Sequence, residues 1–336
     1  MSLATVLPMT LPRLQDQHGR SKRKLRVSLT DRCNLRCPYC MPDHPQWLPK
    51  AQILRREELM RLLDLFVVQG GIRELRLTGG EPLLRRDLIE IVRECGDLRR
   101  RGLQRISLTT NALLLAQHVD KLADAGLDDL NISLDALDET AFNRMSGGHG
   151  SVQQVLDGIR AARDSGLPVK INSVIIRGYN EDQVLPLVRW ACSEDVPLRF
   201  IEFMPLDGRG EWHAGRVVSE AEMLAPLRAE FRLEAQPETD EPARYYRIDG
   251  RYLLGVISTI SKPFCKRCDR LRLTATGELY SCLFAEKGRD LRTLLRSDAA
   301  DAELLAAIRG EVWSKGKGYL ANGYVERPIF MNAIGG

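Results

Sequence analysis

The feature that most constrains the fold is a regular alternation of β-rich and helical segments between Leu25 and Phe203. Strands separated by helices favour a parallel sheet with right-handed crossovers. Six such units are too few to close a barrel of eight units. The sequence therefore predicts an α/β fold, a partial (β/α)6 barrel that is open on one side. The expected strands are 25–30, 74–78, 104–109, 129–134, 169–175 and 198–203, and the expected helices are 55–69, 87–101, 116–125, 151–165 and 181–192.

The rhythm changes after Phe203, where the segments become short and uneven. A helix near 219–230 precedes an acidic, proline-containing stretch at 236–242, which indicates a loop or linker. Later segments indicate strands at 244–248 and 252–257 and helices near 290–297 and 302–314. We therefore expect three parts: a mobile N-terminal lead-in over 1–24, the barrel over 25–244 and a smaller C-terminal domain over 245–336.

Composition and charge limit the class of protein. With 44% hydrophobic and 28% charged residues, the chain matches a globular protein that buries a core. A formal net charge of +4 does not demand a nucleic-acid partner, although an anionic substrate would need a local basic pocket. Ser2, Pro8 and Pro12 interrupt the N-terminal apolar residues, and no segment has the length of a membrane span. We expect a cytoplasmic protein with neither a membrane nor a nucleic acid as partner.

Six of the eight cysteines fall into two groups, and in a reducing compartment they are not expected to form disulfides. The first group, Cys33, Cys37 and Cys40, follows the first predicted strand, at the sheet edge where the chemistry of parallel α/β folds collects. Three thiolates can hold three irons of a [4Fe–4S] cubane and leave the fourth iron open to a ligand. A zinc site with His44 as fourth ligand is the alternative, although the C-x3-C-x2-C spacing is unusual for zinc.

The second group, Cys265, Cys268 and Cys282, again supplies three thiolates. A zinc ribbon would need a fourth ligand at a similar spacing, and none follows Cys282. A second three-cysteine cubane with an open iron fits better. Arg270 and Arg272 lie beside this group, and the alternative for these arginines is a solvated basic loop.

The first group resembles the signature of a known superfamily. C-x3-C-x2-C after the first strand, with Tyr39 before the third cysteine, resembles the motif of radical S-adenosylmethionine (SAM) enzymes. Thr78-Gly-Gly-Glu-Pro82, after the second strand, resembles the glycine-rich segment beside the SAM amino group in that superfamily. The resemblance implies that the open iron binds SAM. It further implies that the reduced cluster cleaves SAM to methionine and a 5′-deoxyadenosyl radical.

Over nearly the whole chain, from Leu25 to Gly336, the sequence resembles the MoaA family of GTP 3′,8-cyclases. Both cysteine groups, the run Cys268-Asp-Arg-Leu-Arg-Leu273 and the terminal Gly335-Gly336 carry this resemblance. It implies two [4Fe–4S] clusters and SAM as cofactors, and GTP as substrate with its guanine at the open iron of the second cluster. The implied lyase reaction abstracts the ribose 3′ hydrogen and joins that carbon to guanine C8. Its product is 3′,8-cyclo-7,8-dihydro-GTP, in the first step of molybdenum cofactor biosynthesis.

The resemblance also implies residue roles. The implied cluster ligands are Cys33, Cys37, Cys40, Cys265, Cys268 and Cys282. The implied SAM contacts are Tyr39, Gly80, Ser133 and Met204. The implied GTP contacts are Arg26, Arg76, Thr109, Lys170, Arg270, Leu271 and Arg272. The implied catalytic residues are Arg270, Arg272, Gly335 and Gly336, although Met331-Asn-Ala precedes this tail where the family pattern has a serine and a larger residue.

Charge chemistry supports the GTP contacts independently. A triphosphate carries about four negative charges, and arginine pairs with phosphate through two hydrogen bonds. Arg26, Arg76 and Lys170 lie on predicted strands, where an inward-facing basic side chain is costly unless an anion neutralises it. For each residue taken alone, an outward-facing side chain is an equal alternative, because successive side chains of a strand face opposite sides of the sheet.

Two other classes of protein remain alternatives at this point. One is a different two-cluster radical SAM enzyme, such as a peptide-modifying enzyme, and the other is a zinc-stabilised nucleic-acid-binding module. The family resemblance implies a homodimer, an external reductant of flavodoxin or ferredoxin type, and a downstream cyclic pyranopterin monophosphate synthase. Cys95 and Cys192, outside both groups, are expected to be small apolar residues of helices.

Overall fold

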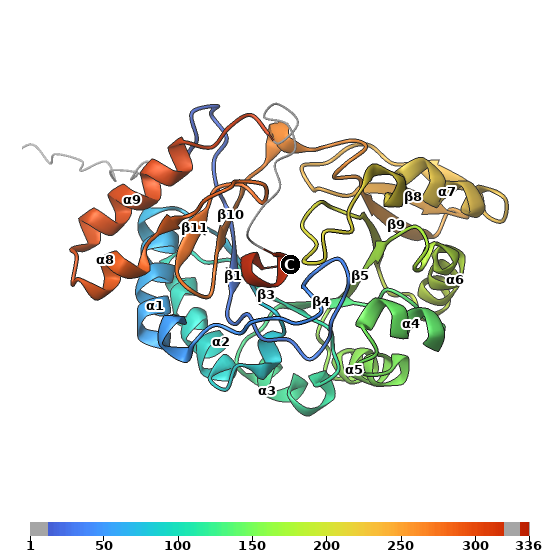
Figure 1. The fold of residues 1–336 in the computed structure, drawn as a ribbon, viewed down its shortest axis with the longest axis horizontal. Coiled ribbons are helices and arrows are strands. Elements are labelled where there is room, and N and C mark those ends of the chain that lie inside the picture. Colours follow the sequence, from blue (N-terminus) through green and yellow to red (C-terminus); the bar gives the residue numbers. More distant parts are fainter. Residues whose placement is uncertain (1–12, 319–329, 336) are drawn as a thin grey trace, which may run out of the picture.

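The computed structural model describes residues 13–318 and 330–335, and its centre is a curved sheet of parallel strands (Figure 1). These strands pair in chain order, and the six predicted strands are confirmed within two residues at each end. Parallel pairing joins β1 (Lys24–Ser28), β2 (Glu74–Thr78), β3 (Arg105–Thr110), β4 (Asp129–Ser133), β5 (Val169–Ile175) and β6 (Leu198–Glu202).

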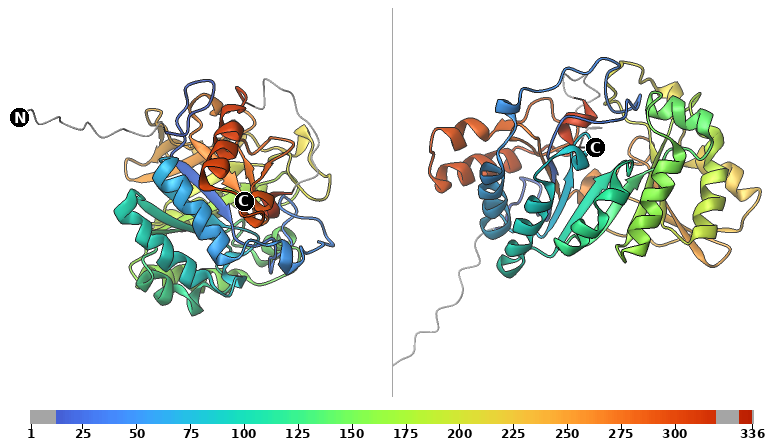
Figure 2. Two further views of the ribbon diagram at one scale, coloured as in Figure 1. Left: turned by 90° about the vertical axis from the view of Figure 1, so that its left-hand side faces the viewer. Right: turned by 90° about the horizontal axis from the view of Figure 1, so that it is seen from below.

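Helices surround the outer side of these strands (Figures 1 and 2). They are α1 (Arg56–Asp64), α2 (Leu88–Asp97), α3 (Val119–Asp124), α4 (Glu139–Ser146), α5 (Val152–Asp164) and α6 (Val184–Glu194). The helices and the outward-facing strand residues form one continuous core, in which Leu62, Ile106 and Leu130 are fully buried. Helix α4 is not among the predicted helices, because its eight residues bury only two large apolar side chains, Phe142 and Met145.

The C-terminal part of the chain extends both edges of the same sheet. On one side, β9 (Tyr252–Ile257) pairs parallel with β6, followed by antiparallel β8 (Arg244–Ile248) and β7 (Leu233–Ala235). On the other side, β10 (Arg270–Leu273) pairs parallel with β1, followed by antiparallel β11 (Glu278–Tyr280) and β12 (Arg289–Asp290). Three helices accompany these strands: α7 (Glu220–Arg228), α8 (Arg292–Arg296) and α9 (Asp301–Trp313). The outermost of the described strands, β12 and β7, do not meet, so the barrel is partial and open as predicted.

The connection from β9 to β10 determines where the second cysteine group lies. β9 stands beside β6 at one end of the parallel strands, whereas β10 stands beside β1 at the other end. Residues 258–269, which include Cys265 and Cys268, therefore cross the open side of the barrel. The same sheet therefore contains strands from both sides of the predicted domain boundary at 244–245.

Residues 13–22 form a short folded segment, which we call the N-terminal strap. Leu14, Asp16 and Lys22 are buried, and the Leu14 N–H donates a 3.0 Å hydrogen bond to the Gly70 carbonyl. The expectation of a mobile lead-in over 1–24 therefore differs from the structure for residues 13–24, because paired charges and one buried leucine hold this polar segment in place. Residues 1–12 lie outside the described residues.

The end of the chain returns to the opening of the barrel. The short helix α11 (Met331–Ile334) lies there, near the carboxyl ends of the parallel strands (Figure 1). The Asn332 N–H donates to the Cys40 carbonyl at 3.3 Å, so this turn contacts the first cysteine loop. Across residues 13–318 and 330–335, no helix combines the length and the apolar content that crossing a membrane requires.

Candidate active site

One pocket at the opening of the barrel is lined by both cysteine groups. The first group reaches it from the loop after β1, and the second from the crossing connection and the turn after β11. The predicted ligands that line it are Cys33, Cys37, Cys40, Cys265, Cys268 and Cys282. The fold therefore brings together two groups that are separated by more than 200 residues in the sequence.

The first cysteine loop packs directly on the glycine-rich segment after β2. The N–H of Gly80 donates to the Thr30 carbonyl at 2.7 Å, and the N–H of Glu81 donates to the Arg32 carbonyl at 2.7 Å. A Cβ atom at position 80 would lie 2.2 Å from the Arg32 carbonyl oxygen. Glycine is therefore required here by the backbone of the cysteine loop itself, in addition to any ligand that approaches it.

Carboxyl groups surround the first cysteine loop. Burial, together with the neighbouring Glu81, raises the pKa of the Cys33 thiol to about 11. Burial raises the pKa of Asp135 to about 6, even though the Val174 N–H and the Tyr39 hydroxyl both donate to this carboxyl group. The surroundings of this loop therefore favour a ligand that brings positive charge.

Cations surround the second cysteine loop. Burial raises the pKa of the Cys268 thiol, but Lys315 and Arg270 outweigh this effect and bring the pKa down to about 7. The Lys315 ammonium lies 3.2 Å from the Cys268 sulfur. The Arg270 guanidinium lies 4.7 Å from the centre of the Phe264 ring, which holds it at the pocket wall.

The donor chemistry fits iron–sulfur clusters at both loops. All six cysteines are free thiols, and three come from each loop. Within the described residues, no three His, Cys, Asp or Glu side chains converge as ligands of a single metal ion. A cubane distributes its thiolate ligands over different irons, so three thiols from each loop suit it.

A row of arginines lines the floor of the pocket. Arg272 on β10, Arg26 on β1 and Arg76 on β2 are direct neighbours in the strand register, so their side chains share one face of the sheet. Burial and the charges of Arg272 and Arg76 hold the pKa of Arg26 well below its usual value. Burial and Arg199 likewise lower the pKa of Arg76 to about 10. These clustered like charges indicate a site for a polyanion.

Arg199 on β6 is a site residue that the sequence analysis does not identify. It is buried, lines the pocket and donates to the side-chain oxygens of Asn172 (3.0 Å) and Asn131. A Cβ at Gly255 would lie 2.7 Å from Arg199 Cγ, so this glycine makes room for the arginine. The sequence did contain a signal for this residue, because Arg199, like Arg26, is a basic residue inside a predicted strand.

The other predicted contacts divide into two sets. Pocket-lining positions include the four predicted for SAM and most of those predicted for GTP: Tyr39, Gly80, Ser133, Met204, Arg26, Arg76, Thr109, Arg270 and Arg272. Lys170 on β5 is half-buried and is not among the pocket-lining residues, while burial and Arg199 lower its pKa. The Leu271 side chain is fully buried in the core, so only its backbone is available to a ligand.

The glycine tail reaches the arginine row. The Arg272 guanidinium donates to the carbonyls of Gly335 and Ile334. A Cβ at Gly335 would lie 2.8 Å from Thr78 Cγ2, and the φ angle of +82° there favours glycine. Gly336, the other predicted catalytic glycine, lies outside the described residues. Of the two cysteines outside the groups, Cys95 is buried in the core and Cys192 packs partly buried against it.

Comparison with known families defines the class of this protein. The family description "Radical SAM superfamily" matches residues 27–191, and "Molybdenum Cofactor Synthesis C" matches residues 196–321. The chain is thus a radical SAM protein with the C-terminal region of molybdenum cofactor synthesis proteins. It is 44% identical over 331 residues to a GTP 3′,8-cyclase of Streptomyces coelicolor, covering 96% of both chains. The chain therefore belongs to the GTP 3′,8-cyclase family.

Other relatives and solved structures agree with this assignment. A GTP 3′,8-cyclase of Rhodopseudomonas palustris is 44% identical over 324 residues, covering 95% of this chain and 93% of the relative. Among solved structures, Streptococcus suis SuiB bound to its precursor peptide SuiA matches with a TM-score of 0.57 and 15% identity, over 87% of this chain and 68% of that one. At this identity the similarity to SuiB shows the fold alone. Family membership decides against the zinc-stabilised nucleic-acid-binding module.

Proposed function

We propose that this chain is a GTP 3′,8-cyclase that uses SAM and two [4Fe–4S] clusters to convert GTP to 3′,8-cyclo-7,8-dihydro-GTP. The observation that supports this most strongly is the single pocket that joins two three-cysteine loops and a row of arginines. A radical generated at one loop could reach a substrate held at the other without leaving this pocket. The reaction is the first step of molybdenum cofactor biosynthesis.

Cys33, Cys37 and Cys40 would hold one cluster, and Cys265, Cys268 and Cys282 the other. When bound, the first cluster supplies the electron that cleaves SAM to the 5′-deoxyadenosyl radical, and the second offers an open iron to the guanine base. Tyr39, Gly80, Ser133 and Met204 form the pocket wall on the SAM side. The Tyr39 hydroxyl donates to Asp135 at 2.8 Å, which holds the tyrosine side chain in place at the pocket wall.

The arginine row would bind the GTP triphosphate. Arg26, Arg76 and Arg272 share one face of the sheet, and Arg199 approaches from β6. Burial first, and repulsion from neighbouring arginines second, lower the pKa values of Arg26 and Arg76, and the negative charge of a bound triphosphate would offset both effects. Thr109 would add a neutral hydroxyl beside these arginines, and Lys170 would add positive charge from β5 outside the pocket lining. Arg270 would lie beside the base and the second cluster.

An apolar cluster would exclude water from the reacting atoms. Met331 and Ile334 of α11 are buried with Leu206 and Tyr280, and Met204, Leu283 and Cys40 pack against them. This cluster connects both cysteine loops through the C-terminal turn. A closed, dry pocket protects a carbon radical from side reactions. Gly335 would then lie next to the substrate, held through Arg272. A catalytic role for Gly336, which lies outside the described residues, rests on the family resemblance.

The remaining partners are also proposals. We propose that the enzyme acts in the cytoplasm as a homodimer, as the resemblance to the MoaA family implies. A one-electron reductant of flavodoxin or ferredoxin type would reduce the first cluster. A cyclic pyranopterin monophosphate synthase would consume the product.

The test is anaerobic incubation of the reconstituted protein with SAM, GTP and a reductant, followed by mass analysis of the nucleotides. We expect 5′-deoxyadenosine, methionine and a cyclised dihydro-GTP, with about eight irons per chain for two cubanes. Formation of 5′-deoxyadenosine without any change in GTP would contradict the cyclase proposal. Protein that contains zinc and no iron would contradict the radical mechanism as well.

A further inference from the structure

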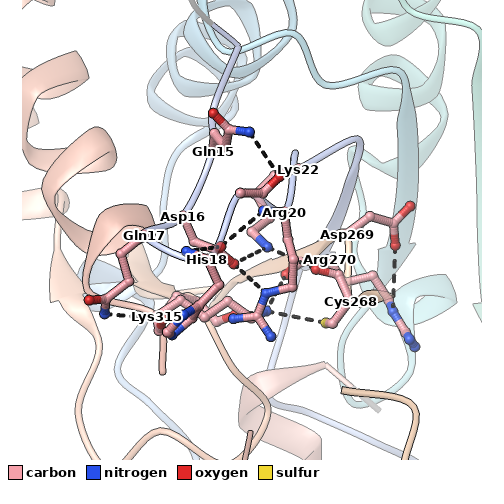
Figure 3. Close-up of polar contacts among 12 residues, drawn as sticks. Gln15, Asp16, Gln17, His18, Arg20, Lys22, Cys268, Asp269, Arg270 and Lys315 are labelled. Atoms are coloured by element: carbon pink, nitrogen blue, oxygen red, sulfur yellow. Dashed lines mark hydrogen bonds and ion pairs between the residues drawn. The ribbon is translucent and has the colours of Figure 1, made fainter. Parts of the chain in front are cut away.

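A buried network of charges lies behind the second cysteine loop, and the cyclase reaction as described gives it no role (Figure 3). The Lys22 ammonium lies 2.7 Å from the Asp16 carboxylate, and both side chains are completely buried. Lys22 also donates to the Cys268 carbonyl at 2.8 Å. The N-terminal strap therefore contacts the backbone of a predicted cluster ligand directly.

Arg20 connects the strap to two other segments. Its guanidinium donates to the Asp16 carboxylate at 2.7 Å and to the Cys265 carbonyl at 2.8 Å. It also donates to the carbonyls of Gly316 (2.6 Å) and Lys317 (3.0 Å), just after α9. The strap thus ties the second cysteine loop to residues 315–318.

Lys315 is the residue of this segment that reaches a ligand sulfur. It is buried, and its ammonium donates to the Cys268 sulfur at 3.2 Å, to the Arg270 carbonyl at 3.2 Å and to the Ser281 carbonyl. Ser281 precedes Cys282 in the sequence. One ammonium therefore contacts both segments that carry the second cysteine group, the one with Cys268 and the one with Cys282. A Cβ at Gly318 would lie 2.6 Å from Cys265 Cβ, so residues 315–318 pack closely against the third ligand as well.

A positive charge at this position has a defined physical consequence for a cluster. A cubane with three thiolate ligands carries net negative charge, and each added electron increases it. An adjacent buried ammonium stabilises the more negative, reduced form, because Coulomb interactions are strong where water is excluded. Hydrogen bonds to ligand sulfurs are among the factors that set cluster potentials.

We propose that Lys315 is a positioning residue of the second cluster that raises its reduction potential, and that Asp16, Arg20 and Lys22 hold it in place. Asp16 neutralises one of the two lysines, so the Lys22 ammonium is paired within the strap and Lys315 is directed at the thiolate. The inference rests on the proposed second cluster. Through Lys315 the chain would control the electron affinity of the cluster that faces GTP.

The test uses the full chain with Cys33, Cys37 and Cys40 replaced by alanine, so that only the second cluster contributes to the spectrum. The reduction midpoint is measured anaerobically by electron paramagnetic resonance during titration with a one-electron reductant. In this background Lys315→Met should lower the equilibrium constant for reduction about tenfold, which is about 59 mV for one electron. Lys315→Arg should restore most of the difference. Lys317→Met, which removes an exposed charge two residues away, serves as the matched control and should change nothing.

Each outcome bears on a distinct claim. A parent protein without about four irons would defeat the proposed second cluster, whatever the variants do. A parent with the cluster and an unchanged midpoint in Lys315→Met would overturn the role of Lys315. If Lys315→Met loses its iron, Lys315→Gln keeps a hydrogen-bond donor without the charge and should still show the lowered midpoint. Iron loss from both neutral variants with retention in Lys315→Arg would support the role of the charge, whereas iron loss from all three would overturn it.

Discussion

The two cysteine loops supply the same number of thiols but lie in opposite electrostatic surroundings. Around the first loop, burial and Glu81 raise the pKa of Cys33 to about 11. Around the second loop, Lys315 and Arg270 outweigh burial and lower the pKa of Cys268 to about 7. Carboxyl groups thus dominate one side of the pocket and cations the other.

This difference in charge explains how one pocket could bind SAM at one loop and GTP at the other. SAM carries a positive sulfonium, which suits the side where the Asp135 carboxyl group lines the pocket. GTP carries a polyanionic triphosphate, which suits the side with the arginine row and Lys315. The identical donor sets would bind similar clusters, so the surrounding charges, and not the ligand cysteines, would decide which small molecule occupies each open iron.

The largest expected effect comes from removing one cysteine of each loop. Cys37→Ala should abolish reductive cleavage of SAM, because the proposed first cluster would lose one of its three cysteine ligands. Cys268→Ala should leave SAM cleavage intact and abolish cyclisation of GTP. Chromatography of 5′-deoxyadenosine and mass analysis of the nucleotide measure both reactions. Equal effects of the two variants on both reactions would erase the distinction between the loops.

Asp16→Asn should weaken the second loop alone. Burial raises the pKa of Asp16, but hydrogen bonds from Lys22 and Arg20 outweigh it and bring the pKa down to about 2. The stabilising charge is therefore fully present at neutral pH and is lost only as the pH falls toward 2. Removing one partner of a buried pair costs about 3 kcal/mol, which denaturant unfolding at pH 7 would show.

A matched control for this variant is Asp240→Asn. The Asp240 side chain is 92% exposed and pairs with Arg267 at 3.3 Å, so its loss should cost less than about 1 kcal/mol. Asp16→Asn should also release iron from the second cluster before the first under a chelator. Simultaneous release from both clusters would indicate a general loss of folding.

Arg270→Ala should weaken GTP binding and leave SAM binding unchanged. One charged hydrogen-bond partner is worth about 1.5–3 kcal/mol, which corresponds to at least a tenfold increase in the GTP dissociation constant. Arg267→Ala is a suitable control, because this exposed arginine three residues away contacts the surface carboxylates of Glu238 and Asp240 and the Thr239 carbonyl. Equilibrium binding to anaerobic protein provides the measurement. An unchanged GTP dissociation constant would remove Arg270 from the substrate site.

The smallest effect is expected from Asp135→Asn. The substitution removes negative charge and leaves one acceptor oxygen where the carboxylate has two, which accept from Tyr39 and Val174. We expect SAM affinity to fall several-fold, equivalent to about 1 kcal/mol, with GTP affinity unchanged. Parallel titrations with SAM and GTP measure both. A larger effect on GTP than on SAM would reverse the proposed polarity of the pocket.

The sequence predicted the elements that depend on local pattern. The strands from β1 to β6 and all six grouped cysteines were accessible, because strand–helix alternation and cysteine spacing are local signals. For Leu271 the local strand pattern argues against a side-chain contact with GTP. It alternates with Arg270 and Arg272 along β10, so its side chain faces the core while theirs face the pocket.

The missed features depend on long-range topology. Lys315 follows α9 and looks like an ordinary basic residue at a helix end, yet the crossing of residues 258–269 places Cys268 beside it. The N-terminal strap looks like a polar lead-in, because no local pattern shows that Asp16 and Lys22 pair with each other in a buried position. The contacts of Lys315 with the Cys268 sulfur and of Lys22 with the Cys268 carbonyl join residues distant in sequence, and such contacts leave no periodic signal in either segment.

The central claim is that the two loops are separate sites for two different ligands. It is tested most directly by measuring SAM and GTP binding to two full-length variants, one with Cys33, Cys37 and Cys40 replaced by alanine and one with Cys265, Cys268 and Cys282 replaced. We predict that the first variant keeps about four irons, binds GTP with unchanged affinity and loses SAM binding, while the second shows the opposite pattern. Full SAM affinity in the first variant, or full GTP affinity in the second, would contradict this account.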